Sequence, residues 1–350
     1  MKVCDCCFKD EEIKGYIVSI SIEKGVCECC SEESNLIELT ELKDFFSEFL
    51  SIYKYDDING IPLIDLIETD WELFASKEAG SIILADIDIE IALSYEQVLT
   101  LLENPISSNT KVSYIDEIEE SVLFWEKLKK DLKHRRRFLT DISEMEDLGW
   151  DASFNVFSTI DSTIPIYRAR INLEGLTKPY DIAEMSSPPE TKTTAGRANP
   201  QGIPYLYLSR DLKTTLYESR ATFLDYVSIG EFKVDDGLIL TIVDFTKKLS
   251  PFNEMGNIIN FTKGKFIRKV ISQDLSKPLL RYDSELEYIP TQFICEYIRF
   301  FTSPAVGIQF NSSLDKEGVN FVLFDDSNIK CIAVNTHQIT KIDIDSNKIS

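Results

Sequence analysis

The stretch TAGRANPQGIPYLYLSRDLKTTLYESRA, from Thr194 to Ala221, combines side chains that could bind an anion and stabilise a cation. Arg197 precedes an Asn-Pro pair and Gly202, which are typical of tight turns. Its guanidinium is therefore expected on a rigid loop, where it can bind phosphate or carboxylate bidentately. Tyr207 lies in the short strand expected next, and Glu218 lies in the helix expected after it.

The segment Tyr167-Arg168-Ala169-Arg170 places two more arginines on another expected strand. Arginine binds phosphate, a tyrosine ring can stack on a flat ring, and a carboxylate stabilises an electron-poor sugar carbon. The combination fits a dinucleotide that is cleaved at its glycosidic bond. The residues alone leave a structural alternative open, because arginines on strands also pair with glutamates. On the strand of Tyr207 we expect Tyr205 to belong to the core.

Six of the eight cysteines lie within the first 30 residues. They include two CxxC pairs, Cys4-x2-Cys7 and Cys27-x2-Cys30, whose spacing is typical of a zinc ribbon. Cys6 and Cys29 are alternative ligands. Four thiolates leave no open coordination position, so the expected Zn²⁺ is structural.

Charge is distributed unevenly along the chain of 350 residues, whose net charge is -22. Residues 1–150 hold 15 Lys and Arg against 34 Asp and Glu, whereas residues 151–350 hold 22 against 25. This balance disfavours general nucleic-acid binding, because phosphates would be repelled. The second half could hold an anionic ligand. The acidic first half could dock a partner or simply form a solvated face.

The chain contains no apolar run of about 18 residues, so no membrane span is predicted. The first residues lack the apolar stretch of a signal peptide, and we expect a cytoplasmic protein. Its length predicts more than one domain. We divide it into a zinc knuckle over 1–33, an acidic helical domain over 34–155, and a third domain over 156–345.

Apolar periodicity predicts the elements that position these residues. Helices are expected over 36–53, 62–76, 94–103 and 113–138, and residues 81–89 are compatible with a strand or with a loop and helix start. The basic cluster 133–137 is interpreted as a solvated helix end, with an anion or partner site as the alternative. Beyond 155 the pattern predicts an α+β domain with a mostly antiparallel sheet. Its expected strands are 164–173, 203–209, 227–234, 238–245, 305–313 and 320–326, and its expected helices are 210–223 and 291–301.

The order of motifs over about residues 163–326 resembles the RES domain family. The matching segments are IYRAR, then AGRANPQGIPYLYLSRDLKTTLYESRA, YIPTQFICEYIRF, VGIQFNSS and GVNFVLFDD. The resemblance implies a fold similar to the ADP-ribosyltransferase toxins. It also implies a toxin that destroys NAD⁺ at the nicotinamide–ribosyl bond, by hydrolysis or by phosphorolysis.

The resemblance also assigns roles to individual residues. Arg168 and Glu218 match the family's arginine and glutamate, and Ser312 is favoured as its serine. The NAD⁺-binding set that it implies is Arg197, Tyr207, Asn199, Gln292 and Ser313.

The first half resembles the HEPN/RES N-terminal domain found before some RES domains. RNA cleavage by this half is disfavoured, because no arginine lies four to six residues before His134, and His337 lacks a suitable pattern too. A free NAD⁺-consuming enzyme would kill its host, so control by an antitoxin or a defence sensor is expected. Two alternatives stay open, ADP-ribosyl transfer to a macromolecule and a non-catalytic nucleotide-binding adaptor. A homo-oligomer is compatible with the sequence.

Overall fold

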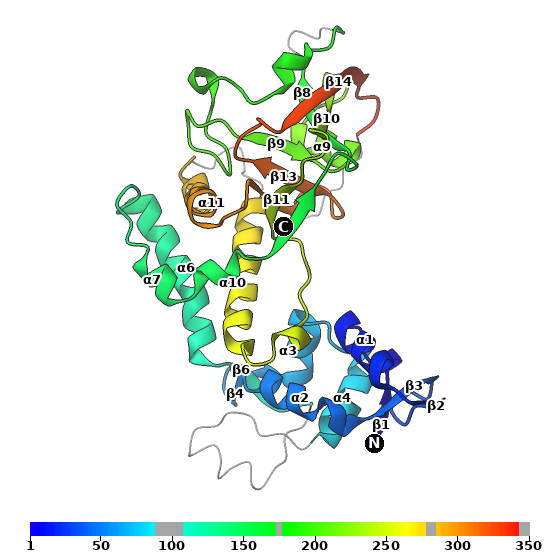
Figure 1. Cartoon of the computed structure of the whole chain (residues 1–350). Coiled ribbons are helices and arrows are strands. Elements are labelled where there is room, and N and C mark those ends of the chain that lie inside the picture. The colour runs from blue at the N-terminus through cyan, green and yellow to red at the C-terminus, as the bar shows by residue number, and fades with distance from the viewer. Residues whose placement is uncertain (88–107, 173–176, 278–284, 343–350) are drawn as a thin grey trace, which may run out of the picture. The chain divides into compact units, whose positions relative to one another are not determined.

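The computed structural model describes residues 1–87, 108–172, 177–277 and 285–342 (Figure 1). The chain divides into two compact units. The first consists of Met1–Phe124 with Lys248–Lys265, and the second of Trp125–Lys247 with Phe266–Ser350. Helices α6 (Asp116–His134) and α10 (Ile258–Ser276) each contribute residues to both units.

The first unit contains two small antiparallel sheets and several short helices. One sheet has the order β1-β3-β2, and the other has the order β4-β6-β5. The strands are β1 (Lys2–Cys4), β2 (Glu23–Val26), β3 (Glu33–Glu38), β4 (Tyr53–Tyr55), β5 (Ile61–Pro62) and β6 (Lys111–Tyr114). The helices are α1 (Glu11–Ile20), α2 (Lys43–Leu50), α3 (Leu63–Asp70) and α4 (Lys77–Asp86).

The helix expected over 36–53 is confirmed only in its central part, which forms α2 (Lys43–Leu50). At both ends the prediction is wrong, because the chain there forms strands. Leu36 and Ile37 belong to β3, where they pair with Cys4 and Val3, and Tyr53 begins β4. Residues 81–86 are helical in α4, because the Ser76 side chain caps the helix by accepting a hydrogen bond from the Ala79 amide at 3.2 Å. The helix expected over 94–103 lies outside the described residues.

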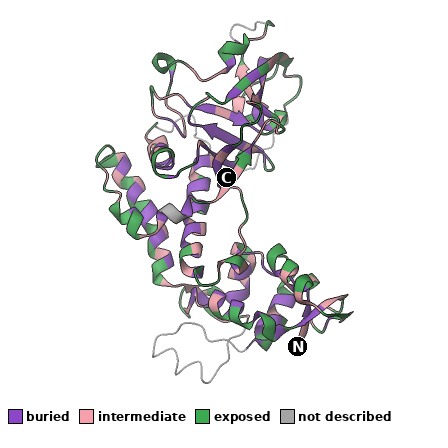
Figure 2. Cartoon of the chain, viewed as in Figure 1, coloured by how far each residue is buried: buried purple, intermediate pink, exposed green. Residues whose placement is uncertain are grey.

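The second unit is built around an eight-stranded mixed sheet with the order β14-β10-β8-β9-β13-β12-β11-β7. Its strands are β7 (Phe157–Ile160), β8 (Ile166–Ile171), β9 (Leu206–Ser209), β10 (Tyr226–Val234), β11 (Leu240–Asp244), β12 (Gly307–Asn311), β13 (Val319–Leu323) and β14 (Ile329–Gln338). β11 and β12 are parallel, and the other pairs are antiparallel. Buried side chains follow these strands (Figure 2). The α+β prediction is thus confirmed, as a mixed sheet.

Helices α9 (Leu212–Ser219) and α11 (Ile289–Phe301) of the second unit occur where they were expected. The shorter helices α7 (Ser143–Asp147) and α8 (Trp150–Ser153) follow α6. Helix α10 was not predicted. Its apolar pattern is interrupted by buried polar side chains, Thr262, Lys263, Arg268 and Ser272.

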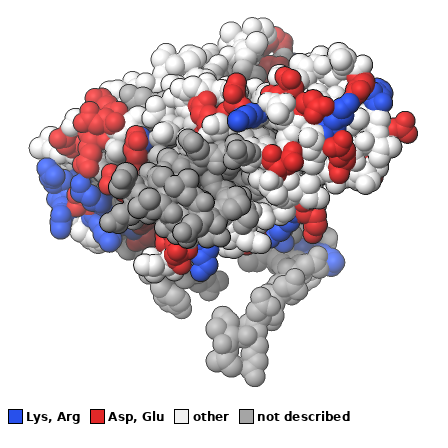
Figure 3. Space-filling model, turned by 90° about the horizontal axis from the view of Figure 1, so that it is seen from below, with Lys and Arg blue, Asp and Glu red and all other residues white. Residues whose placement is uncertain are grey.

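Figure 3 shows acidic and basic side chains interspersed with uncharged ones on the face in view. At the end of α6, Arg135 pairs with Asp131 at 3.3 Å, and Arg137 donates to the Lys133 carbonyl at 3.1 Å. Both contacts support the helix-end interpretation of the basic cluster. None of the described helices has the length and apolar character needed to cross a membrane.

Candidate active site and cysteine cluster

A cavity of about 350 Å³ lies in the second unit, within the size range of ligand pockets, roughly 300–1,000 Å³. It brings together four of the residues singled out in the sequence. These are Arg168 on β8, Arg197 on the loop before β9, Tyr207 on β9 and Glu218 on α9.

Glu218 lies in the last turn of α9, where the negative end of the helix dipole disfavours a carboxylate. Two side chains compensate by donating to the same carboxylate oxygen. Ser312 Oγ and Asn320 Nδ2 each lie 2.7 Å from Glu218 Oε1. Charge-assisted hydrogen bonds of this kind fix the orientation of the carboxylate toward the cavity.

Ser312, rather than Ser313, is the serine that contacts Glu218. It follows β12, and its Oγ also accepts hydrogen bonds from the amides of Leu314 at 3.1 Å and Asp315 at 3.2 Å. Because the Ser312 oxygen accepts from these two amides, its hydroxyl proton is free to be donated to Glu218. Ser312 is buried and Ser313 is exposed, and neither serine lines the cavity itself.

Asn320 was missed by the sequence analysis, although it lines the cavity and is buried. It pairs with Ser209 across β13 and β9, and Ser209 Oγ donates to Asn320 Oδ1 at 2.8 Å. This contact turns the Asn320 amide nitrogen toward Glu218. The available signal was a polar residue within the apolar run of β13.

Arg168 and Arg197 are both held by backbone carbonyls. Arg168 Nη1 donates to Met185 at 2.9 Å and to Ser186 at 2.6 Å. Burial, with a smaller contribution from Arg170, lowers the pKa of Arg168 to about 10, so it stays charged at neutral pH.

Arg197 Nη1 lies 3.4 Å from the carbonyl oxygens of Leu275 and Ser276, at the end of α10. Within the described part of the chain, neither Arg168 nor Arg197 pairs with a carboxylate. Their positive charge is therefore available to an anion in the cavity.

Tyr207 braces the loop that carries Arg197. Its hydroxyl donates to Asn199 Oδ1 at 2.7 Å and accepts from the Ala198 amide at 3.0 Å. Burial raises the pKa of Tyr207, which keeps the hydroxyl protonated for this bond. Gly196 is required beside it, because a Cβ there would lie 2.5 Å from Asn199 Oδ1 and 2.6 Å from the Tyr207 hydroxyl.

Asn199 and Gln292 form hydrogen bonds with the backbone of the same loop and do not line the cavity. Asn199 Nδ2 donates to the carbonyls of Thr194, Pro200 and Ile203 at 3.0–3.1 Å. Gln292 Nε2 donates to the carbonyls of Gly196 at 2.8 Å and Asn199 at 3.0 Å. These contacts favour a positioning role for both side chains.

Two neighbouring side chains lie outside the cavity lining. Tyr205 is buried against Phe324, as expected for a core residue. Arg170 donates to the Glu184 carbonyl and lies 4.7 Å from the centre of the Tyr180 ring.

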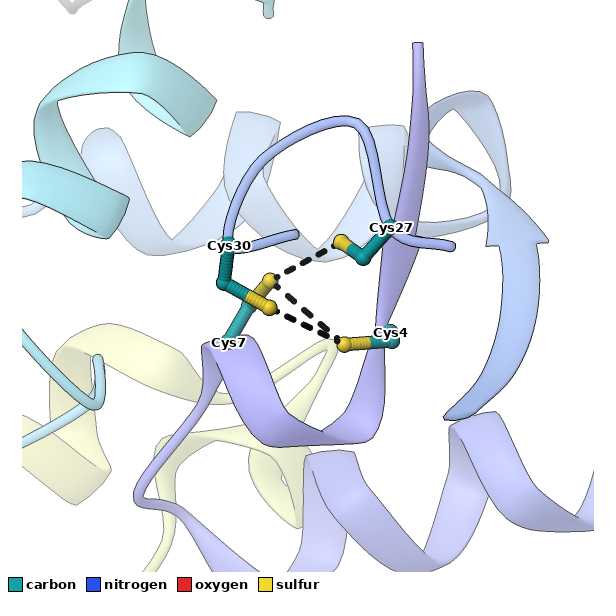
Figure 4. A group of neighbouring side chains, drawn as sticks. All are labelled: Cys4, Cys7, Cys27 and Cys30. Carbon is teal, nitrogen blue, oxygen red and sulfur yellow. Dashed lines mark hydrogen bonds between the residues drawn. The ribbon is translucent and has the colours of Figure 1, made fainter. Parts of the chain in front are cut away.

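In the first unit, the sulfur atoms of Cys4, Cys7, Cys27 and Cys30 converge (Figure 4). The Sγ–Sγ distances are 3.8 Å for Cys4–Cys7, 3.4 Å for Cys4–Cys30 and 3.5 Å for Cys7–Cys27. A tetrahedral site with metal–sulfur bonds of about 2.3 Å has edges of about 3.8 Å, so the four thiols are placed to hold a metal ion.

Neither alternative ligand belongs to this group of four, although Cys6 forms a second group with Cys4 and Asp5 whose ligand atoms lie within 4.8 Å of one another. Cys6 is exposed, and Cys29 Sγ contacts the Ala79 carbonyl at 3.7 Å.

No curated protein and no solved structure matches the chain. The family model of the RES domain matches residues 165–345, which include β8 to β14 and the whole lining of the cavity. The chain therefore belongs to the RES domain family.

Proposed function

We propose that this protein degrades NAD⁺ by cleaving the bond between nicotinamide and ribose. The observation that carries the proposal is the pair of hydrogen bonds that hold Glu218 in a cavity shared with Arg168 and Arg197. The carboxylate suits a reacting carbon that becomes cationic. The two arginines, which pair with no described carboxylate, suit a pyrophosphate. Membership of the RES family is consistent with an NAD-related, toxin-like function.

In the proposed mechanism, Arg168 and Arg197 bind the phosphates, and Glu218 stabilises the oxocarbenium-like transition state as nicotinamide leaves. Ser312 and Asn320 occupy Glu218 Oε1. Oε2, which accepts no hydrogen bond from a described residue, faces the ribose in this proposal. Nicotinamide leaves as a neutral group, so the reaction needs little acid catalysis, and the cavity lining contains no histidine.

Water or phosphate then attacks the ribosyl carbon, giving a glycohydrolase or a phosphorylase. The proposal extends to an ADP-ribosyltransferase-like fold, a cytoplasmic location, and control by an antitoxin or a defence sensor. Such control follows from the toxicity of unrestrained NAD⁺ loss.

We further propose that the cysteine cluster binds Zn²⁺ and stabilises the fold of the first unit. Burial raises the pKa of the Cys4 and Cys7 thiols, so thiolates at these positions need a compensating cation. Zn²⁺ bound by four thiolates has no open position for a substrate.

The catalytic proposal is tested by measuring nicotinamide release from NAD⁺ by the purified full chain, with and without phosphate. Glu218→Gln and Arg168→Ala should reduce release at least about a hundredfold. Arg170→Ala, on the same strand, and the exposed Glu190→Gln serve as matched controls and should retain it.

The products decide the acceptor. Free ADP-ribose indicates water, ADP-ribose phosphate indicates phosphate, and label on a macromolecule indicates ADP-ribosyl transfer. Equal release by wild type, Glu218→Gln and Arg168→Ala would refute the assignment. NAD⁺ binding without any release would favour the nucleotide-binding adaptor.

A further inference from the structure

The second unit contains another cavity, of about 250 Å³, which shares the lining residue Tyr288 with the cavity of Arg168 and Glu218. It is called the second cavity below. Its walls are the last turns of α6, the C-terminal end of α10 and the start of α11. Five of its lining side chains are basic, namely Lys129, Lys130, Lys133, His134 and Lys277. Its acidic lining residues are Glu126, Asp274 and Glu287.

The carboxylates of this cavity neutralise only two of its lysines. Lys129 pairs with Glu126 at 2.7 Å and with Asp274 at 2.9 Å. Lys133 pairs with Glu287 at 2.7 Å.

Lys130 and Lys277 form no ion pair with any carboxylate in the described ranges. The cavity therefore carries surplus positive charge in a chain whose net charge is -22. Such a local surplus attracts anions.

The two cavities share structural elements. Tyr288, next to α11, lines both of them. Thr291 Oγ1 donates to the Arg197 carbonyl oxygen at 2.5 Å. The Arg197 guanidinium in turn contacts the Leu275 and Ser276 carbonyls, between the cavity-lining residues Asp274 and Lys277. A ligand in the second cavity would thus contact the same segments that form hydrogen bonds with Arg197.

We propose that the second cavity binds a phosphoryl group through Lys130 and Lys277. Ammonium groups bind phosphate as point charges, and the volume accommodates a phosphoryl group with part of the molecule that carries it. The group belongs either to the dinucleotide substrate of the proposed function or to a separate phosphorylated small molecule. The assignment of the phosphoryl group to the dinucleotide substrate rests on the proposed function, whereas the anion site itself does not.

In the test, the full chain is titrated with inorganic pyrophosphate. Binding is measured by calorimetry and by the shift in melting temperature. The double variant Lys130→Ser, Lys277→Ser removes the two lysines that form no ion pair with a described carboxylate, and both side chains are exposed, so folding should be retained. The control Lys127→Ser, Lys269→Ser removes the same charge from α6 and α10, away from the cavity, whereas Lys277 directly follows α10. Wild type and control should bind pyrophosphate about tenfold or more tightly than the cavity variant.

Pyrophosphate should also raise the melting temperature of the wild type by more than that of the cavity variant. Equal affinities in all three proteins would overturn the proposal, because any binding would then be independent of Lys130 and Lys277. Equal losses in both double variants would overturn it too, because they would report net charge alone.

Nicotinamide release without added phosphate distinguishes the two sources. A higher KM for NAD⁺ in the cavity variant, with unchanged kcat, assigns the phosphoryl group to the substrate. An unchanged KM together with lost pyrophosphate binding assigns it to a separate molecule. If the wild type releases no nicotinamide, the proposed function fails, and the calorimetry still decides whether the cavity is an anion site.

Discussion

Ser312 and Glu218 lie 94 positions apart in the sequence and are joined by a hydrogen bond of 2.7 Å. The serine follows a central strand, and the glutamate lies in the last turn of a helix. The contact therefore depends on the assembled sheet domain. It is made by Ser312, the serine favoured from the sequence, and not by the adjacent Ser313.

Ser312→Ala should reduce kcat for nicotinamide release by about ten- to a hundredfold, because a hydrogen bond to a charged group contributes roughly 1.5–3 kcal/mol. Ser313→Ala, at the neighbouring exposed position, should stay within about twofold of wild type. Steady-state kinetics on the two variants give the comparison. The reverse order of effects would assign the role to Ser313.

Asn320→Ala should lower kcat by about tenfold through loss of one donor to Glu218. Asn320→Asp should lower it further, because a second carboxylate would repel the first. Ser209→Ala, which removes the hydrogen bond that orients Asn320, should have the smallest effect. Kinetics and melting temperatures are measured together. If activity follows the melting temperature across the three variants, Asn320 serves the fold and not the orientation of Glu218.

The sequence identifies Arg168, Arg197 and Glu218 because short motifs surround each of them. It does not reveal the contact of Asn320 with Ser209, because that contact requires the register between β13 and β9. Backbone pairing of distant strands is not encoded by a local pattern. The separation of Asn199 and Gln292 from the cavity is likewise a matter of tertiary structure.

Within the large sheet, the two strands missing from the sequence analysis are β7 and β14, which form its edges. An edge strand has a neighbouring strand on one side only, and most side chains of β7 and β14 are only partly buried or exposed. In β14, for example, buried Ile329 and Cys331 alternate with exposed Lys330 and Ile332. The inner strands are covered by neighbours and have the β-rich patterns that predict them.

Purified protein should contain one Zn²⁺ per chain, measured by elemental analysis. Cys7→Ser should abolish binding and destabilise the first unit, because the free energy of metal binding contributes to folding. Cys6→Ser, which changes an exposed thiol outside the group of four, should retain the metal. Loss of metal in Cys6→Ser with retention in Cys30→Ser would show that Cys6 is a ligand.

Gly196→Ala should displace the loop of Arg197, because the new Cβ would collide with Asn199 Oδ1 and the Tyr207 hydroxyl. We expect a loss of about 1–3 kcal/mol in the free energy of unfolding and a raised KM for NAD⁺. Tyr207→Phe removes the hydroxyl without adding volume, so it should reproduce the effect on KM with a smaller loss of stability.

Gly15→Ala provides the control for this substitution, because a Cβ at Gly15 meets no atom within 4 Å. Denaturant unfolding and steady-state kinetics measure both effects. A Gly196→Ala variant that loses stability but keeps its KM would show that the loop fixes the fold without fixing Arg197. If Tyr207→Phe alone raises KM while Gly196→Ala leaves it unchanged, the Tyr207 hydroxyl contacts the substrate directly.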